Sequence, residues 1–189
     1  MKKTLITVLV TVLVCCTAFG ATYAWLMDKT ATITNTFTFG DVSITLEETE
    51  GEGNDTAKTF KMVPGATIDK DPKVSVVAGS EACWLFVKID ASANYSEFFA
   101  TYVVADGWTA LTGNAGVYYR SVTASDNAQD FYVLKDNQVT VLDTVTQAQF
   151  NAIKNGSASA PTLSFTAYAV QSEGVGDAAT AWGIANSNP

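Results

Sequence analysis

The chain has 189 residues, 48% of them hydrophobic, with 19 acidic and 11 basic side chains, three cysteines, no histidine and a net charge of −8. The lack of histidine excludes a histidine-ligated zinc site, a Ser-His-Asp or Cys-His catalytic arrangement and an imidazole general base. The acidic balance disfavours nucleic acid and anionic membrane surfaces as partners.

The N-terminal segment has the pattern of a cleaved export signal. Lys2 and Lys3 form a basic region, the apolar run 5–19 follows it, and the junction ending at Ala24 consists mainly of small residues. This order is typical of a secretory signal peptide. We expect cleavage between Ala24 and Trp25, and a secreted protein located in the extracellular matrix or at the cell surface.

Removal of residues 1–24 leaves 165 residues, with nine basic and 19 acidic side chains and a net charge of −10. That length is typical of one domain, and we expect a leading strand over 25–39 followed by a single domain over 40–189. The alternative is an uncleaved anchor, because residues 5–24 are just long enough to cross a hydrocarbon core of about 30 Å. Four threonines interrupt that run and no basic residues follow it closely, which favours cleavage.

The first mature residues predict one long half-buried strand. Threonine occupies every even position from 30 to 38. Six of the eight odd positions from 25 to 39 carry apolar residues, namely Trp25, Met27, Ala31, Ile33, Phe37 and Phe39. This period of two is that of a strand with one buried face. At Gly40 the phase shifts by one residue, and Val42, Ile44 and Leu46 continue it, which indicates a bulge or a tight corner.

The segment 47–58 is acidic and lacks apolar periodicity, so we expect an exposed loop. Its carboxylates leave weak calcium binding open, although the order of ligands found in calcium loops is missing. A turn signal at 62–65 then precedes a short strand expected over 73–78.

The segment 82–90 alternates most clearly. One face carries Cys83, Leu85, Val87 and Ile89, so Cys83 is expected to be a buried core residue rather than a reactive thiol. Further strands are expected over 100–104, 117–122, 131–134, 138–142 and 163–171.

Two short helices are expected among these strands. Thr146 and Gln149 match a capping box for the first, and Asp177 can cap the second, over 178–185, with Trp182 packed inward. Many short strands at regular spacing predict an all-β fold, an antiparallel β-sandwich with one or two short helices.

Several segments resemble the TasA/camelysin family of secreted Gram-positive proteins. They are the signal ending Gly-Ala-Thr-Tyr-Ala at 20–24, Trp-Leu-Met-Asp at 25–28, Thr-Asn-Thr-Phe-Thr-Phe-Gly-Asp-Val-Ser-Ile at 34–44, the Pro-Gly…Lys segment at 64–72, and residues 79–83 and 166–171. The resemblance covers residues 1–90 and 163–183 and is weak between them.

The resemblance implies a jelly-roll-like sandwich that polymerises into fibres of the biofilm matrix after processing by a SipW-type signal peptidase. Subunits of such fibres join head to tail by donor-strand exchange, so the partners are further copies of the chain and other matrix proteins. Carried over to this chain, the donor strand is 25–39 with Ile33, Phe37 and Phe39 as its anchors. The alternative is that 25–39 is the first strand of a self-contained monomer, because periodicity does not say which subunit owns the groove.

Two other classes of function are alternatives to a fibre subunit. Camelysins have been described as metallopeptidases, but the chain lacks H-E-x-x-H, and Asp143-Thr144-Val145 lacks the glycine of an aspartic protease loop. We therefore expect no enzyme, no catalytic or metal-binding residues and no cofactor. A surface module that binds carbohydrate is the other alternative, and its candidate aromatic residues, which are more often core or cross-strand pairs, are Trp84, Trp108, Tyr118, Tyr119 and Tyr132.

Overall fold

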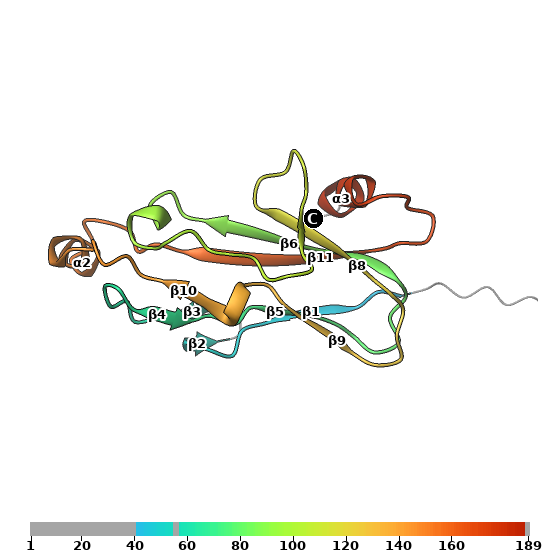
Figure 1. Ribbon diagram of the computed structural model, residues 1–189, viewed down its shortest axis with the longest axis horizontal. Helices are drawn as coiled ribbons and strands as arrows, with labels where there is room; N and C mark the ends of the chain where they lie inside the picture. The colour runs from blue at the N-terminus through green and yellow to red at the C-terminus, as the bar shows by residue number, and fades with distance from the viewer. Residues whose placement is uncertain (1–40, 55–56, 188–189) are drawn as a thin grey trace, which may run out of the picture. The chain divides into compact units, whose positions relative to one another are not determined.

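Two antiparallel sheets stacked face to face form the centre of the fold (Figure 1). The computed structural model describes residues 41–54 and 57–187, which lie within the compact unit Phe39–Pro189. The predicted all-β antiparallel sandwich with short helices is confirmed. The expected cleavage site at Ala24 and Trp25, the anchors Ile33, Phe37 and Phe39, and the phase change at Gly40 lie outside the described residues.

The first sheet has the strand order β1-β5-β9, with β1 (Ile44–Glu47), β5 (Lys73–Val76) and β9 (Gln129–Tyr132). At one end, β4 (Thr67–Asp69) pairs with β10 (Gln138–Thr140), just before β5 and just after β9 in the chain. The strand expected over 100–104 is instead an extended segment, held at two points by the bridges Phe99–Val141 and Val104–Leu134.

The second sheet has the order β11-β6-β8-β7, with β6 (Cys83–Ala91), β7 (Thr109–Ala110), β8 (Val117–Val122) and β11 (Leu163–Gln171). The bounds of β8 and β11 match the expected strands. β11 pairs with β6 along its whole length, from Leu163 opposite Ala91 to Gln171 opposite Cys83.

The core between the sheets follows from the alternation of β6. Cys83, Leu85 and Val87 are fully buried and pack with Val74 and Val76 of the first sheet. Burial raises the pKa of the Cys83 thiol to about 11. Because the thiolate is the nucleophilic form, Cys83 is a core residue, as predicted.

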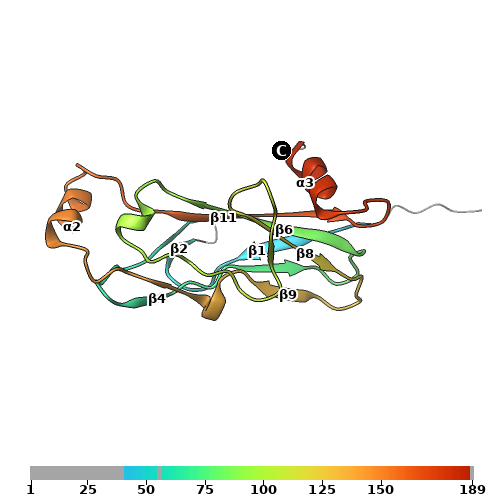
Figure 2. The same ribbon diagram turned by 45° about the horizontal axis from the view of Figure 1, so that its top comes forward.

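The other face of the second sheet is covered by α3 (Ala178–Ser187) (Figure 2). Phe86 of β6 is fully buried there, and its ring centroid lies 5.4 Å from that of Trp182. The Asp177 carboxylate caps the helix by accepting a hydrogen bond of 2.8 Å from the Thr180 N–H. The predicted cap and the inward packing of Trp182 are both confirmed.

The second helix, α2 (Gln147–Lys154), closes one end of the sandwich. Its capping box is formed as predicted, because the Thr146 side chain accepts from the Gln149 N–H while the Gln149 side chain accepts from the Thr146 N–H. Phe150 and Ile153 pack against a small cluster made of Phe98, Val141 and Val145.

The expectation of an exposed loop over 47–58 is wrong in part. A hairpin of β2 (Glu52–Asn54) and β3 (Ala57–Thr59) occupies this region. The chain leaving β1 is held by the Asp71 carboxylate, which accepts hydrogen bonds from the N–H groups of Thr49, at 3.0 Å, and Glu50, at 2.9 Å. Partial burial raises the pKa of Asp71, but the hydrogen bond from the Thr49 hydroxyl, together with those from the Glu50 and Thr49 N–H groups, outweighs it and the net pKa is lowered. A polar segment without periodicity can thus be ordered by one distant side chain.

Candidate functional site

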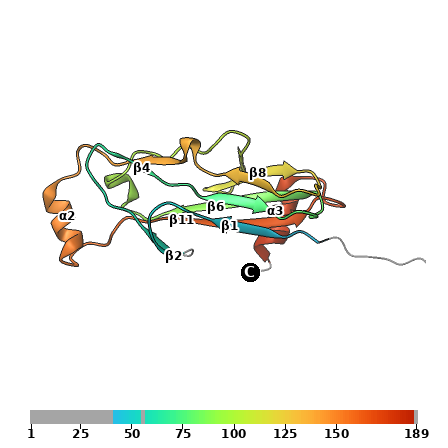
Figure 3. The ribbon, with the colours of Figure 1, turned by 90° about the horizontal axis from the view of Figure 1, so that it is seen from below.

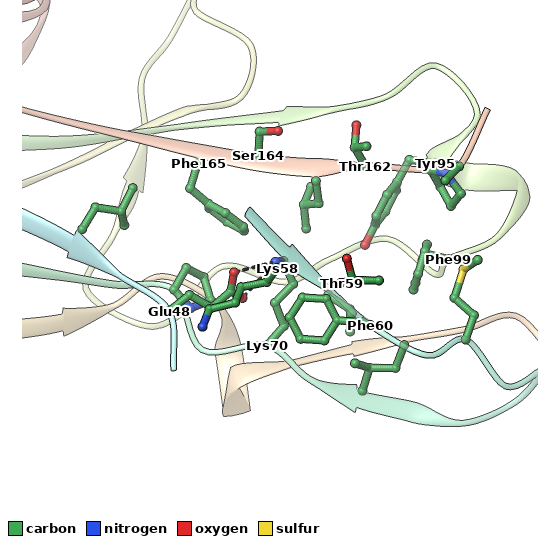
Figure 4. Close-up of a pocket in the computed structure, with 18 of the residues that line it drawn as sticks. Glu48, Lys58, Thr59, Phe60, Lys70, Tyr95, Phe99, Thr162, Ser164 and Phe165 are labelled. Atoms are coloured by element: carbon green, nitrogen blue, oxygen red, sulfur yellow. Dashed lines mark hydrogen bonds and ion pairs between the residues drawn. The ribbon is translucent and has the colours of Figure 1, made fainter. Parts of the chain in front are cut away.

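A cavity of about 710 Å³ lies on the side of the sandwich where the edge strands of the two sheets meet. β1 is an edge strand of the first sheet and β11 of the second, and the two run side by side (Figure 3). We call this the edge cavity (Figure 4). It is lined by Leu46–Glu48, Lys58–Phe60, Met62, Ile68, Lys70, Pro72, Tyr95, Phe99, Val139 and Ala160–Phe165.

The edge cavity exists because β1 stops early. β1 pairs with β5 only as far as Glu47, opposite Lys73, and the chain then turns toward Asp71. Among the described strands, β4 therefore pairs with β10 on one side only. Lys70 N–H donates to Asn137 O and Val141 N–H donates to Ala66 O. The main-chain groups of the even-numbered residues in this segment therefore face β10. The main-chain groups of the residues between them point away from β10, and Ile68 of β4 lines the edge cavity.

The second wall of the edge cavity is also a sheet edge. In the described part of the chain, β11 pairs with β6 and with no other strand. Ser92 N–H donates to Thr162 O, so even-numbered residues bond to β6. The main-chain groups of odd-numbered residues, starting with Leu163 and Phe165, face outward. Two edges with unpaired donors and acceptors therefore flank one cavity, and such edges are templates for adding a strand.

The lining between these edges is mainly apolar and only partly covered. The apolar side chains that line it and are half-buried are Leu46, Phe60, Met62, Ile68, Phe99, Pro161, Leu163 and Phe165. A partly exposed apolar surface of this kind gains free energy when another group covers it. The edge cavity is thus suited to apolar side chains that arrive on an extended backbone.

A buried ion pair forms one wall of the edge cavity. Lys70 is 7% exposed, and its Nζ lies 2.9 and 3.0 Å from the two carboxylate oxygens of Glu48. The same ammonium lies 4.7 Å from the centroid of the Phe60 ring and 5.3 Å from that of Phe165. Figure 4 shows the pair beside the two aromatic rings. The two opposite charges neutralise each other, so the pair forms part of the cavity wall without adding net charge.

Tyr95 brings an unsatisfied polar atom to the cavity. The residue is 7% exposed and its hydroxyl has no hydrogen-bond partner among the described residues. Its ring stacks on Phe99 with centroids 4.9 Å apart and meets Tyr102 edge-on at 6.2 Å. Burial, and then the neighbouring Tyr102, raise the pKa of Tyr95 to about 12, so the hydroxyl stays protonated. In Figure 4 the ring reaches into the cavity with its hydroxyl foremost.

The five candidate aromatic residues for a carbohydrate platform do not form one. Trp108 is buried, and its Nε1–H donates to Tyr132 O at 2.9 Å. Trp84 and Tyr119 pack edge to face with centroids 6.0 Å apart, and Tyr118 is half-buried. Tyr132 is 47% exposed. Four of the five are thus core or cross-strand residues.

The described residues hold no group of three or more histidine, cysteine, aspartate or glutamate side chains placed to bind a metal ion. Asp143 lies two residues before Val145, which is buried in the cluster beside α2. Within the same residues, neither helix is long and apolar enough to cross a membrane.

Sequence reasoning missed Glu48, Lys70 and Tyr95 as residues of one site. Lys70 was noted as part of the Pro-Gly…Lys segment, but its partner Glu48 lies in the segment expected to be an exposed loop. The available signal for Glu48 was its position, because it is a charged residue that continues the even-numbered apolar series of Ile44 and Leu46. No local pattern connects Tyr95 to either of them.

Comparison with known proteins gave no match: no family model, no curated protein and no solved structure matches this chain. Its function is therefore argued from its residues and from the geometry of the edge cavity.

Proposed function

We propose that the chain is a secreted structural protein of the TasA/camelysin type that polymerises head to tail into extracellular biofilm-matrix fibres by donor-strand exchange. The observation that carries the proposal is the edge cavity, a mainly apolar cavity between edges of β4 and β11 that no other described strand pairs with. An added strand can bond to either edge with its main chain while its alternate side chains enter the cavity.

The donor in this proposal is the segment 25–39, freed when the signal peptidase cuts between Ala24 and Trp25. Its anchors are Ile33, Phe37 and Phe39. Burying three such side chains contributes about 1.5–3 kcal/mol each, in addition to the main-chain hydrogen bonds. Fifteen extended residues span at most about 50 Å, which is enough to reach a neighbouring subunit.

Head-to-tail exchange explains filaments rather than closed oligomers. Each subunit offers a donor at one place and a cavity at another, so the contact is heterologous and does not close on itself. The mature charge of −10 opposes association at low salt. We therefore expect assembly to strengthen as carboxylates are protonated near pH 5.

The test is negative-stain electron microscopy of mature protein beginning at Trp25, incubated at high concentration near pH 5. We expect regular filaments. A matched variant beginning at Gly40 should fold, remain monomeric and gain thermal stability when a peptide of residues 25–39 is added, because a ligand that binds the folded state stabilises it.

Two outcomes contradict the proposal. If the variant beginning at Gly40 is unfolded, residues 25–39 form an intrachain strand of a monomer. If the mature protein stays monomeric under these conditions, even with other matrix proteins from the same cell, a secreted binding module is the better interpretation.

A further inference from the structure

The odd-numbered face of the donor segment carries two polar residues, Lys29 and Asn35, and of these only Asn35 lies between the apolar anchors. Counting by two from Ala31, the anchor face reads Ala31, Ile33, Asn35, Phe37 and Phe39. The period of a strand places Asn35 on the same side as its apolar neighbours. A carboxamide that enters an apolar cavity without a partner weakens binding, because its hydrogen bonds to water are lost.

Among the described residues that line the edge cavity, one has a buried polar group that is free to receive it. Glu48 and Lys70 satisfy each other at 2.9 and 3.0 Å. The hydroxyl residues that line the cavity, Thr59, Thr162 and Ser164, are exposed to water. The Tyr95 hydroxyl is buried and unbonded among the described residues.

Two other described residues have buried side-chain atoms without a hydrogen bond, and neither lines the edge cavity. They are Arg120, through its Nε, and Asn137, through its Oδ1. The unsatisfied group at the edge cavity is thus the Tyr95 hydroxyl. A protonated phenol donates one hydrogen bond and accepts others, which matches the oxygen and NH₂ of a carboxamide.

We propose that Asn35 of the incoming segment hydrogen-bonds to the Tyr95 hydroxyl of the receiving subunit, and that this pair sets the register of the added strand. The inference rests on the proposed donor-strand exchange. It assigns to Tyr95 a positioning role that is separate from the apolar anchoring.

The register needs such a device because the apolar pattern alone is degenerate. A slip of one residue turns the threonine face inward and is strongly disfavoured. A slip of two residues keeps an apolar face inward, with Phe37 or Ile33 brought to Tyr95. That slip leaves both the Tyr95 hydroxyl and the Asn35 amide without a partner. Single buried asparagines set register in coiled coils in the same way.

The test is a double-mutant cycle in the mature protein, with the critical concentration for filament assembly measured by sedimentation. Asn35→Leu and Tyr95→Phe should each raise it about tenfold, which corresponds to about 1.4 kcal/mol. The double variant should lie well below the roughly hundredfold product of the two, because neither group is then left unpaired. Asn35→Ser, which keeps a short polar side chain, should raise the critical concentration less than Asn35→Leu does.

Matched controls separate this pair from general effects. Thr36→Val lies on the opposite face of the donor, and Tyr102→Phe changes a tyrosine that does not line the cavity. The effect of Thr36→Val on the critical concentration should add to that of Tyr95→Phe, and the effect of Tyr102→Phe should add to that of Asn35→Leu. Circular dichroism checks that each tyrosine variant is folded. If Tyr95→Phe does not fold, the Asn35 variants still test the proposal, because Asn35 lies outside the compact unit Phe39–Pro189.

Solid-state NMR of the filaments measures hydrogen exchange at the Asn35 side chain. This exchange would not change if Tyr95 only supported the fold. The side-chain amide of Asn35 should be protected from hydrogen exchange in the unmodified protein and exposed in Tyr95→Phe. The double variant should give two sets of signals for 31–39, because the slipped register is no longer penalised.

The outcomes distinguish the two proposals. Filaments in which Asn35 exchanges freely, or in which the two substitutions are simply additive, overturn the register pair and leave strand exchange standing. A mature protein that forms no filaments overturns both.

Discussion

The ion pair between Glu48 and Lys70 gives the sharpest test of how the edge cavity is built. Their side chains are 15% and 9% exposed, and two contacts of 2.9 and 3.0 Å join them. Glu48→Ala leaves the Lys70 ammonium buried beside Phe60 and Phe165 without a carboxylate. Removing one partner of a buried pair costs about 3–5 kcal/mol. We expect about 3 kcal/mol here, because the two aromatic faces keep some of the favourable electrostatics.

The assay is urea unfolding of the mature chain, followed by tryptophan fluorescence at pH 7 and at a concentration too low for assembly. The matched control is Glu47→Ala. Glu47 is the preceding residue, its side chain is 55% exposed and it lies 3.9 Å from Lys73, so its loss should cost at most about 1 kcal/mol. The double variant Glu48→Leu with Lys70→Met should recover most of the stability, because an apolar pair needs no compensation.

One result would refute this reasoning. If Glu48→Ala unfolds at the same urea concentration as Glu47→Ala, with an unchanged dependence on urea, the pair does not hold the wall of the edge cavity. A loss of about 3 kcal/mol that the double variant does not reverse would place the cost in packing rather than in the unpaired ammonium.

Phe86→Ala should lower the free energy of unfolding by about 3–5 kcal/mol, because Phe86 is fully buried against Trp182. Urea unfolding measures this change, and a cost below about 1 kcal/mol would mean that α3 does not cover this face. Asp71 has a lowered pKa in the folded state, so its stabilisation is present above the unfolded pKa of about 3.9 and is lost as the pH falls through the folded value. Asp71→Asn should therefore flatten the fall in stability below about pH 4, and an unchanged acid profile would contradict this account. The Cys83 thiol, with its pKa raised to about 11, should react with a thiol reagent at pH 8 only after unfolding, and rapid labelling of the folded protein would show that it is not in the core.

Much of the fold could be predicted from the sequence because it depends on local periodicity. The alternation of Cys83, Leu85 and Val87 predicted both the strand and its buried face, and the bounds of β8 and β11 were also predicted. The caps of both helices were predicted from Thr146 and Asp177, because capping is a short-range hydrogen bond between a side chain and the next turn. These features need information from a few neighbouring residues only.

The candidate site was harder to predict because its parts meet through packing. Glu48 and Lys70 are 22 residues apart, and Asp71 reaches back by a similar separation to hold Thr49 and Glu50. The acidic composition of 47–58 suggested a solvated loop, but the Asp71 carboxylate accepts hydrogen bonds from Thr49 and Glu50 and holds the chain there. Propensity is a local quantity and does not contain such contacts.

By itself, the sequence determined the class of the fold, the buried face of its central strand, and the absence of histidine chemistry. Only the tertiary structure decided that β1 stops at Glu47. Within the part of the chain that it describes, it also decided that free edges of β4 and β11 flank one cavity and that Tyr95 presents an unpaired hydroxyl there. The physical reason is that side-chain alternation is set by backbone geometry within one strand. Which edges stay unpaired depends on where strands from distant parts of the chain come to lie.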